Sequence, residues 1–247
     1  MVETIMYKII TNEMETFWGY KVKVVHRLET NDWLTAMSIL QYDEYKAKDI
    51  SYNEGDVFVD IGSHIGIWGL LMATKNPSYR VFCFEPIPEN YEIIKQVIEE
   101  NNLKNMFVYN LAVSDKSHET EKIYYTKDDT NFGKEHHFVG SMQGGSSQYI
   151  EVPTIALNDI LDYIEAKQCR VLKIDCEGCE IKGFGNITSE NLDRIDYIVG
   201  EFHPWSTSSQ AFFEMFKGKF DNMNFFNVGS EIFTLQEFIF KRIGVNK

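Results

Sequence analysis

The feature that most constrains the fold is an alternation of strand-like and helix-like segments from residue 57 onward. The strand-like segments are short apolar runs at 57–61, 80–85, 106–111, 170–175 and 194–202. Between the first three, apolar residues recur at the spacing of amphipathic helices, at 67–74 and 89–101. Because strands that alternate with helices form mostly parallel sheets covered by helices on both faces, the sequence predicts an α/β fold.

Residues 1–50 precede this alternation. They contain a hairpin pattern around Gly19 and a helical pattern near 32–45. We expect this accessory segment to pack against the sheet edge or to cover a site. The main domain then spans 51–247.

Two parts of the main domain also depart from the alternation. Residues 126–150 are polar, rich in Gly and Ser, and too long for an ordinary connection, which predicts a substrate-facing loop. Near the end, the runs at 224–228 and 233–242 predict a terminal pair of antiparallel strands.

The charge balance argues against nucleic acid as a partner. The 247-residue chain has 37 acidic and 24 basic residues, a net charge of −13, which would repel a phosphate backbone. No apolar run approaches the roughly 18 residues that span a bilayer, and MVETIMYKII lacks the features of a signal peptide. We therefore expect a soluble, cytoplasmic protein with no membrane partner. We also expect reduced cysteines, with Cys83 and Cys169 packed in or beside apolar strands.

The stretch VFVDIGSHIGIWG, residues 57–69, predicts a strand, a glycine turn and a helix. At the end of a parallel strand, such a turn lets a ligand approach the backbone and the free N–H groups of the helix. The dinucleotide pattern G-x-G-x-x-G is broken by His64. Asp60 at the strand end would repel a diphosphate and attract a cationic amino acid group. Glu85 ends the next strand, where acids bind ribose hydroxyls, so the two acids favour S-adenosylmethionine over NAD.

Six motifs follow one another in a fixed order along the chain. They are VDIGSHIG (59–66), FEPIPENYEIIKQVIEENN (84–102), NLAVSD (110–115), VPTIALNDIL (152–161), LKIDCEGCEIKGF (172–184) and VGEFHP (199–204). In this order and spacing they resemble the FkbM-type family of S-adenosylmethionine-dependent methyltransferases, over about residues 50–204. The resemblance implies a class I methyltransferase (Rossmann-like) fold whose seven-stranded sheet has an antiparallel last strand. It also implies methylation of hydroxyl oxygens on sugars and natural products.

By position, the resemblance implies a set of residues that contact the cofactor. These are Asp60, Gly62, Ser63, His64, Gly66, Glu85, Pro86, Ala112 and Asp175. The residues of the glycine turn would surround the methionine part, Glu85 would bind the ribose, and Ala112 would lie near adenine. His64 departs from the family, in which a small or amide residue is common at this position.

The candidate catalytic residues are Asp175, Glu177 and His203. Asp175 and Glu177 follow the strand at 170–175, and His203 follows the strand at 194–202. Carboxylates at a strand end can hold a proton or a substrate hydroxyl, and a histidine can accept a proton near neutral pH. A structural role is the alternative for each, since Glu177 can cap a helix and a lone histidine is more often structural. Lys173 is expected to be a charge partner.

The predicted reaction is direct transfer of a methyl group to a hydroxyl of a small molecule or glycan, with no bound metal. One alternative is a sugar methyltransferase in which Asp175, Glu177 and His203 bind Mg²⁺. The other is a non-catalytic module that binds S-adenosylmethionine only to regulate a partner. Zinc binding at Cys176-x-x-Cys179 is disfavoured, because the chain has no second C-x-x-C. Thioredoxin-type chemistry is disfavoured because its motif normally begins a helix after the first strands of a different fold.

Overall fold

A seven-stranded sheet forms the centre of the molecule. The computed structural model describes residues 7–125, 148–176, 178–202, 209–228 and 235–245. The strand order is β11 (Phe220–Val228), β12 (Leu235–Arg242), β10 (Ile195–Phe202), β9 (Cys169–Ile174), β3 (Val57–Ile61), β4 (Arg80–Phe84) and β5 (Met106–Tyr109). In this sheet β12 alone runs in the direction opposite to the other six strands. The predicted mostly parallel sheet with a reversed last strand is confirmed.

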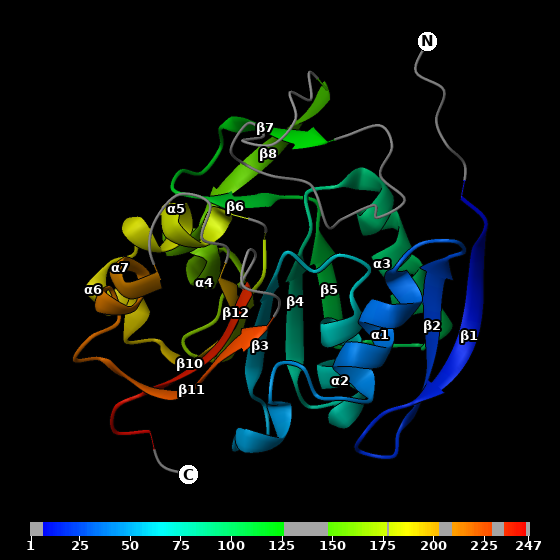
Figure 1. Cartoon of the computed structure of the whole chain (residues 1–247), viewed down its shortest axis with the longest axis horizontal. Helices are drawn as coiled ribbons and strands as arrows, with labels where there is room; N and C mark the ends of the chain where they lie inside the picture. Colours follow the sequence, from blue (N-terminus) through cyan, green and yellow to red (C-terminus); the bar gives the residue numbers. More distant parts are fainter. Residues whose placement is uncertain (1–6, 126–147, 177, 203–208, 229–234, 246–247) are drawn as a thin grey trace.

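Helices cover both faces of the sheet (Figure 1). One face carries α1 (Asp32–Leu40), α2 (Ile67–Lys75) and α3 (Pro88–Glu100), and the other carries η2 (Leu157–Asp159), α4 (Ile160–Tyr163), α5 (Cys179–Gly185), α6 (Ser189–Leu192) and α7 (Ser209–Glu214). Successive side chains of a strand point to opposite faces, so Phe58 enters the first core while Val59 and Ile61 enter the second. The sheet is therefore buried on both sides, as its continuous apolar strands predict.

The segment before the main sheet forms a hairpin and a helix. Strands β1 (Ile9–Glu15) and β2 (Lys21–Arg27) pair antiparallel, and the Asn101 side chain at the end of α3 bonds to the Lys23 backbone. Helix α1 ends at Leu40, earlier than predicted, because Asp43 and Lys46 adopt left-handed backbone conformations. The short helix η1 (Ala47–Asp49) then leads toward β3.

A small second sheet was not predicted from the sequence. It contains β6 (Ala112–Ser114), β8 (Gln148–Ala156) and β7 (Thr120–Tyr125), with β8 in the middle. Residues 148–150, assigned to the substrate loop, instead begin β8, and residues 126–147 lie outside the described ranges. In Figure 1 this sheet lies beyond the carboxyl ends of β3 and β4. Among the described residues, no helix is long and apolar enough to cross a bilayer.

Candidate active site

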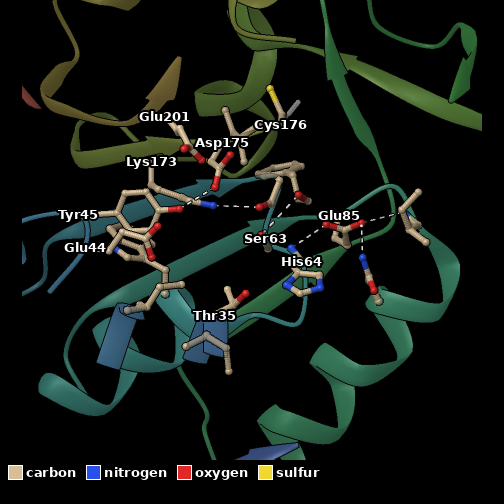
Figure 2. Close-up of a pocket in the computed structure, with 18 of the residues that line it drawn as sticks. Thr35, Glu44, Tyr45, Ser63, His64, Glu85, Lys173, Asp175, Cys176 and Glu201 are labelled. Atoms are coloured by element: carbon tan, nitrogen blue, oxygen red, sulfur yellow. Dashed lines mark hydrogen bonds between the residues drawn. The ribbon is translucent and has the colours of Figure 1, made fainter. Parts of the chain in front are cut away.

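A cavity of about 370 Å³ lies at the carboxyl ends of β3, β4 and β9. Helix α1 and the residues that follow it form one wall, and the turn after β3 forms the floor (Figure 2). Six of the predicted cofactor residues line it, namely Gly62, Ser63, His64, Glu85, Pro86 and Asp175. Asp60, Gly66 and Ala112 do not line it. The predicted catalytic residues Glu177 and His203 lie outside the described residues.

The glycine turn is held tightly between two strand ends. Its Gly62 and Ser63 N–H groups donate to the Phe84 carbonyl at 3.0 and 3.3 Å. Gly62 has a φ of +69°, and a Cβ there would overlap the carbonyl oxygen of Asp175. Only glycine fits both the conformation and this contact. Gly66, with a φ of +80°, is the N-cap residue of α2.

Glu85 follows β4 and is 3% exposed. Its carboxylate accepts hydrogen bonds from the backbone N–H groups of His64 at 2.8 Å and Ile87 at 3.0 Å, and from the Asn90 side chain at 3.3 Å. Burial raises the pKa of Glu85, and these donors oppose the rise. Among the described residues, Oδ1 of the buried Asn90 has no hydrogen-bond partner. Asn90 lines the cavity too, so an unpaired acceptor accompanies the acid.

Asp60 is fully buried outside the cavity lining. Its Oδ1 lies 3.1 Å from Nζ of Lys173, which also donates to the Gly62 carbonyl at 2.9 Å. Burial raises the pKa of Asp60, against the effect of Lys173. Burial opposes the charge of Lys173, yet Asp60 and Asp175 raise its pKa. Lys173 is thus the charge partner that was predicted, and it links Asp60 to the turn.

The position of Asp60 corrects the expectation that this acid ends its strand. Asp60 pairs with Cys83 and Lys173 inside the sheet, and β3 continues to Ile61. Its side chain therefore points to the same face as Phe58, the face that carries α1, α2 and α3, and does not extend beyond the strand end. Ala112, expected near adenine, is fully buried in a small cluster with Ile87, Ile123 and Val152.

Three carboxylates come together at the other end of the cavity. They belong to Glu44 after α1, Asp175 after β9 and Glu201 in β10, and all three line the cavity. Burial and the nearby Asp175 raise the pKa of Glu44. The Tyr45 hydroxyl donates to Oδ2 of Asp175 at 2.6 Å. The sequence did not identify Glu44 or Tyr45, because no motif marks residues 41–50.

His64 ties the turn to the accessory segment. Its Nε2 lies 3.1 Å from Nη2 of Arg27 and 3.2 Å from Oδ1 of Asp32. Arg27 and Asp32 are themselves a buried ion pair at 2.8 Å. Although burial opposes it, the hydrogen bonds from His64 and Arg27 lower the pKa of Asp32. The residue that departs from the family pattern therefore contacts β2 and α1 through its ring, while its N–H binds Glu85.

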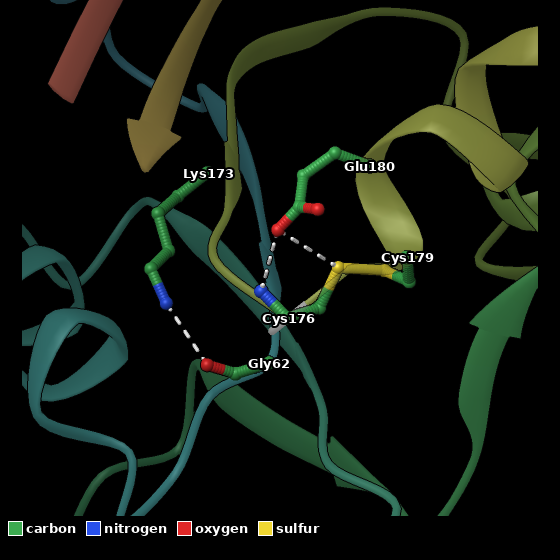
Figure 3. Close-up of a disulfide and its surroundings, with 5 residues drawn as sticks. All are labelled: Gly62, Lys173, Cys176, Cys179 and Glu180. Carbon is green, nitrogen blue, oxygen red and sulfur yellow. Dashed lines mark hydrogen bonds between the residues drawn. A yellow bond between two sulfur atoms is a disulfide. The ribbon is translucent and has the colours of Figure 1, made fainter. Parts of the chain in front are cut away.

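Cys176 and Cys179 form a disulfide, which corrects the expectation that all four cysteines are reduced. Gly178, with a φ of 112°, turns the chain into α5 and leaves the two Cα atoms 5.5 Å apart, within the usual disulfide range. Figure 3 shows Glu180 turned back toward Cys176, whose N–H donates to its carboxylate at 3.3 Å. Cys83 and Cys169 are free and buried, as predicted, and burial raises the pKa of both thiols.

The disulfide predicts a thiol count. Denatured without reductant, the protein should expose two thiols to an alkylating reagent, and four after reduction. The mass of the alkylated chain measures this count. Cys176→Ser should expose three thiols in both states, because Cys179 loses its partner. Four alkylated thiols in the unreduced wild-type protein would show that the disulfide is absent.

The sheet order and the cavity above β3, β4 and β9 define a class I S-adenosylmethionine-dependent methyltransferase. The model of the family described as "Methyltransferase FkbM domain" matches residues 60–226. The chain belongs to this family. A curated relative, Methyltransferase 1 of Beauveria bassiana (strain ARSEF 2860), is 25% identical over 171 residues, which cover 63% of this chain and 68% of the relative.

Solved structures show the same fold. An rRNA methylase from Streptococcus thermophilus has a TM-score of 0.50 and 10% identity, with 83% of this chain and 95% of that chain covered. TrmN from Thermus thermophilus has a TM-score of 0.51 and 8% identity, with 90% of this chain and 55% of that chain covered. At such identities the likeness concerns the fold alone.

Proposed function

We propose that the protein binds S-adenosylmethionine in this cavity and methylates a hydroxyl oxygen of a small molecule or glycan. The observation that carries the proposal is that Glu85 and Asp175, which follow two neighbours of β3, line one cavity on either side of the glycine turn. One acid can bind a ribose, and the other can receive a proton. A parallel sheet binds ligands at this edge.

The residues present fit such a cofactor. The missing Cβ of Gly62 keeps the turn close to β9, and the unpaired Oδ1 of Asn90 offers an acceptor beside Glu85. In this proposal Glu85 binds the ribose hydroxyls, Pro86 flanks the adenosine, and Ser63 lies near the methionine part. Asp60 does not contact the cofactor, and it supports the glycine turn indirectly, because Lys173 connects it to the Gly62 carbonyl. When bound, S-adenosylmethionine supplies an electrophilic methyl group on its sulfonium sulfur.

The reaction is a direct displacement. A lone pair of the acceptor oxygen forms the new oxygen–carbon bond while the sulfur–carbon bond breaks, and its electron pair stays on sulfur in S-adenosylhomocysteine. The hydroxyl proton passes to the Asp175 carboxylate, which acts as general base. The cavity walls align the acceptor with the methyl group, and such alignment supplies much of the acceleration. Glu44 and Glu201 lie on the same side of the cavity, where they can accept hydrogen bonds from further hydroxyls.

Cofactor binding tests the first part of the proposal. Glu85→Gln should weaken binding of S-adenosylhomocysteine by about 10- to 100-fold, because hydrogen bonds to a charged acceptor are lost. Calorimetry measures the affinity, and Glu89→Gln, at an exposed position four residues away on α3, serves as the control that should bind normally. Unchanged affinity in Glu85→Gln, or tight NAD binding by the wild-type protein, would contradict the proposal.

Acceptor screening tests the second part. The protein is incubated with S-adenosylmethionine and a panel of sugars, phenols and aliphatic alcohols, and mass spectrometry detects methylated product. The described residues contain no group of three His, Cys, Asp or Glu side chains that could hold a metal. Because the proposed displacement uses the Asp175 carboxylate as its base and requires no metal, we expect a chelator to leave turnover unchanged. Loss of turnover on chelation, with recovery on added Mg²⁺, would favour the metal-assisted alternative.

A further inference from the structure

Tyr45 connects the accessory segment to the proposed catalytic acid. It lies before residues 60–226, which match the family model, and 130 positions before Asp175. The side chain is 7% exposed, and its hydroxyl donates to Oδ2 of Asp175 at 2.6 Å (Figure 2). A charge-assisted hydrogen bond of this length is strong and directional. It fixes how the carboxylate is oriented at the cavity wall.

The backbone around Tyr45 is held firmly. The Asp43 carboxylate accepts hydrogen bonds from the N–H groups of Ala47 at 2.7 Å and Lys48 at 3.2 Å. The Tyr52 hydroxyl donates to the Ala47 carbonyl at 2.7 Å. The Tyr45 ring belongs to the same buried core as β3 and α2. The phenol therefore approaches Asp175 from a rigid support.

Tyr45 is a permanent donor in this contact. Burial, followed by the charges of Asp175, Glu44 and Glu201, raises its pKa well above the usual value for tyrosine. The phenol stays protonated across the range in which an enzyme is assayed, so Tyr45 does not itself accept the substrate proton. In the described residues, the ionisable groups that act on Asp175 or Tyr45 include Glu44, Asp60, Lys173, Glu201 and Glu237.

We infer that Tyr45 is a positioning residue for methyl transfer, which holds the Asp175 carboxylate in its ionised form and in the orientation that receives the acceptor proton. The inference rests on the proposed role of Asp175 as general base. The nearby acids Glu44, Asp60 and Glu237 disfavour the Asp175 charge, and Tyr45 offsets this repulsion with a hydrogen bond that is stronger to the ionised carboxylate. The accessory segment thereby completes the site of the family domain.

Tyr45→Phe tests the inference, because it removes the hydroxyl and keeps the ring. NMR of protein with isotope-labelled aspartate carboxyl groups follows the Asp175 titration, identified by the signal that Asp175→Asn removes. The titration midpoint should rise by about one pH unit in Tyr45→Phe, since the ionised form loses a donor. This readout needs no acceptor. Tyr79→Phe is the matched control, because it removes the hydroxyl of another buried tyrosine of the same core that supports neither Tyr45 nor Asp175, and it should leave the midpoint unchanged.

Kinetics with the best acceptor complete the test. Tyr45→Phe should lower kcat roughly 10- to 100-fold, with little change in KM for S-adenosylmethionine, and move the acid limb of the pH–rate profile upward. In an Asp175→Asn background the same substitution should have almost no further effect.

The possible outcomes distinguish the positioning role of Tyr45 from the general-base role of Asp175. An unchanged Asp175 midpoint, or kinetic effects that simply add in the double variant, would overturn the role of Tyr45. A shifted midpoint together with full activity in Asp175→Asn would instead overturn the proposed general base and leave the contact intact. Thermal unfolding of each variant identifies any loss of activity that comes from loss of fold.

Discussion

Asp175→Asn should slow methyl transfer by about 100- to 10,000-fold, the range in which general-base catalysis contributes. Asparagine has nearly the same shape and can still accept the Tyr45 hydrogen bond, but it cannot take a proton from the acceptor hydroxyl. The loss should therefore appear in kcat. Affinity for S-adenosylhomocysteine, measured by calorimetry, should change only slightly, because the proposed contacts with the cofactor are spread over the turn and Glu85.

Asp162→Asn provides the matched control for this substitution. Asp162 lies in α4, its side chain is 74% exposed, and it pairs with Arg194 away from the cavity. Its substitution removes the same charge and should leave turnover unchanged. If Asp175→Asn retained more than about a tenth of the wild-type kcat, the general base would have to be another group.

The strand ends that build the site were predictable because their causes are local. Continuous apolar runs mark β4 and β9 as buried strands, and Glu85 and Asp175 follow them directly in the sequence. The carboxyl ends of neighbouring parallel strands meet at one edge of a sheet, so these two acids had to lie near the glycine turn. Their placement on one cavity needs no information beyond the strand pattern and topology.

Asp60 shows where local reasoning fails by a single residue. The sequence predicts the strand at its observed bounds, 57–61, yet the expectation that Asp60 ends it is wrong, because Ile61 follows Asp60 inside β3. Because side chains alternate between faces, Asp60 shares the face of Phe58, which α1, α2 and α3 cover, and there it pairs with Lys173.

Tyr45 and Glu44 could not be predicted, because tertiary packing alone brings them to the cavity. They follow a helix that ends early, in a stretch without motif or periodicity, and Tyr45 meets Asp175 across 130 positions of sequence. The disulfide was missed for a related reason. Cys169 and Cys176 lie at opposite ends of β9 and cannot pair, whereas Cys179, the partner of Cys176, lies across one turn shaped by Gly178.

Gly62→Ala should lower the free energy of unfolding by about 3 kcal/mol more than a matched glycine substitution elsewhere, and it should abolish binding of S-adenosylhomocysteine. The added Cβ would overlap the carbonyl oxygen of Asp175, which belongs to the backbone and cannot rotate away. The end of β9 would have to move from β3, where the Asp175 N–H donates to the Ile61 carbonyl at 3.1 Å. Both the floor of the cavity and the Asp175 carboxylate, the proposed general base, would then be displaced.

Gly55→Ala separates this overlap from backbone strain. Gly55 has a φ of +78°, close to the +69° of Gly62, but a Cβ at Gly55 would have no atom within 4 Å. Both substitutions place alanine in the left-handed region, at a cost of about 1–2 kcal/mol, so the difference between them measures the contact with Asp175. Chemical denaturation gives both free energies. Equal losses in the two variants would mean that the turn can move away from β9, and that Gly62 is required only for its backbone conformation.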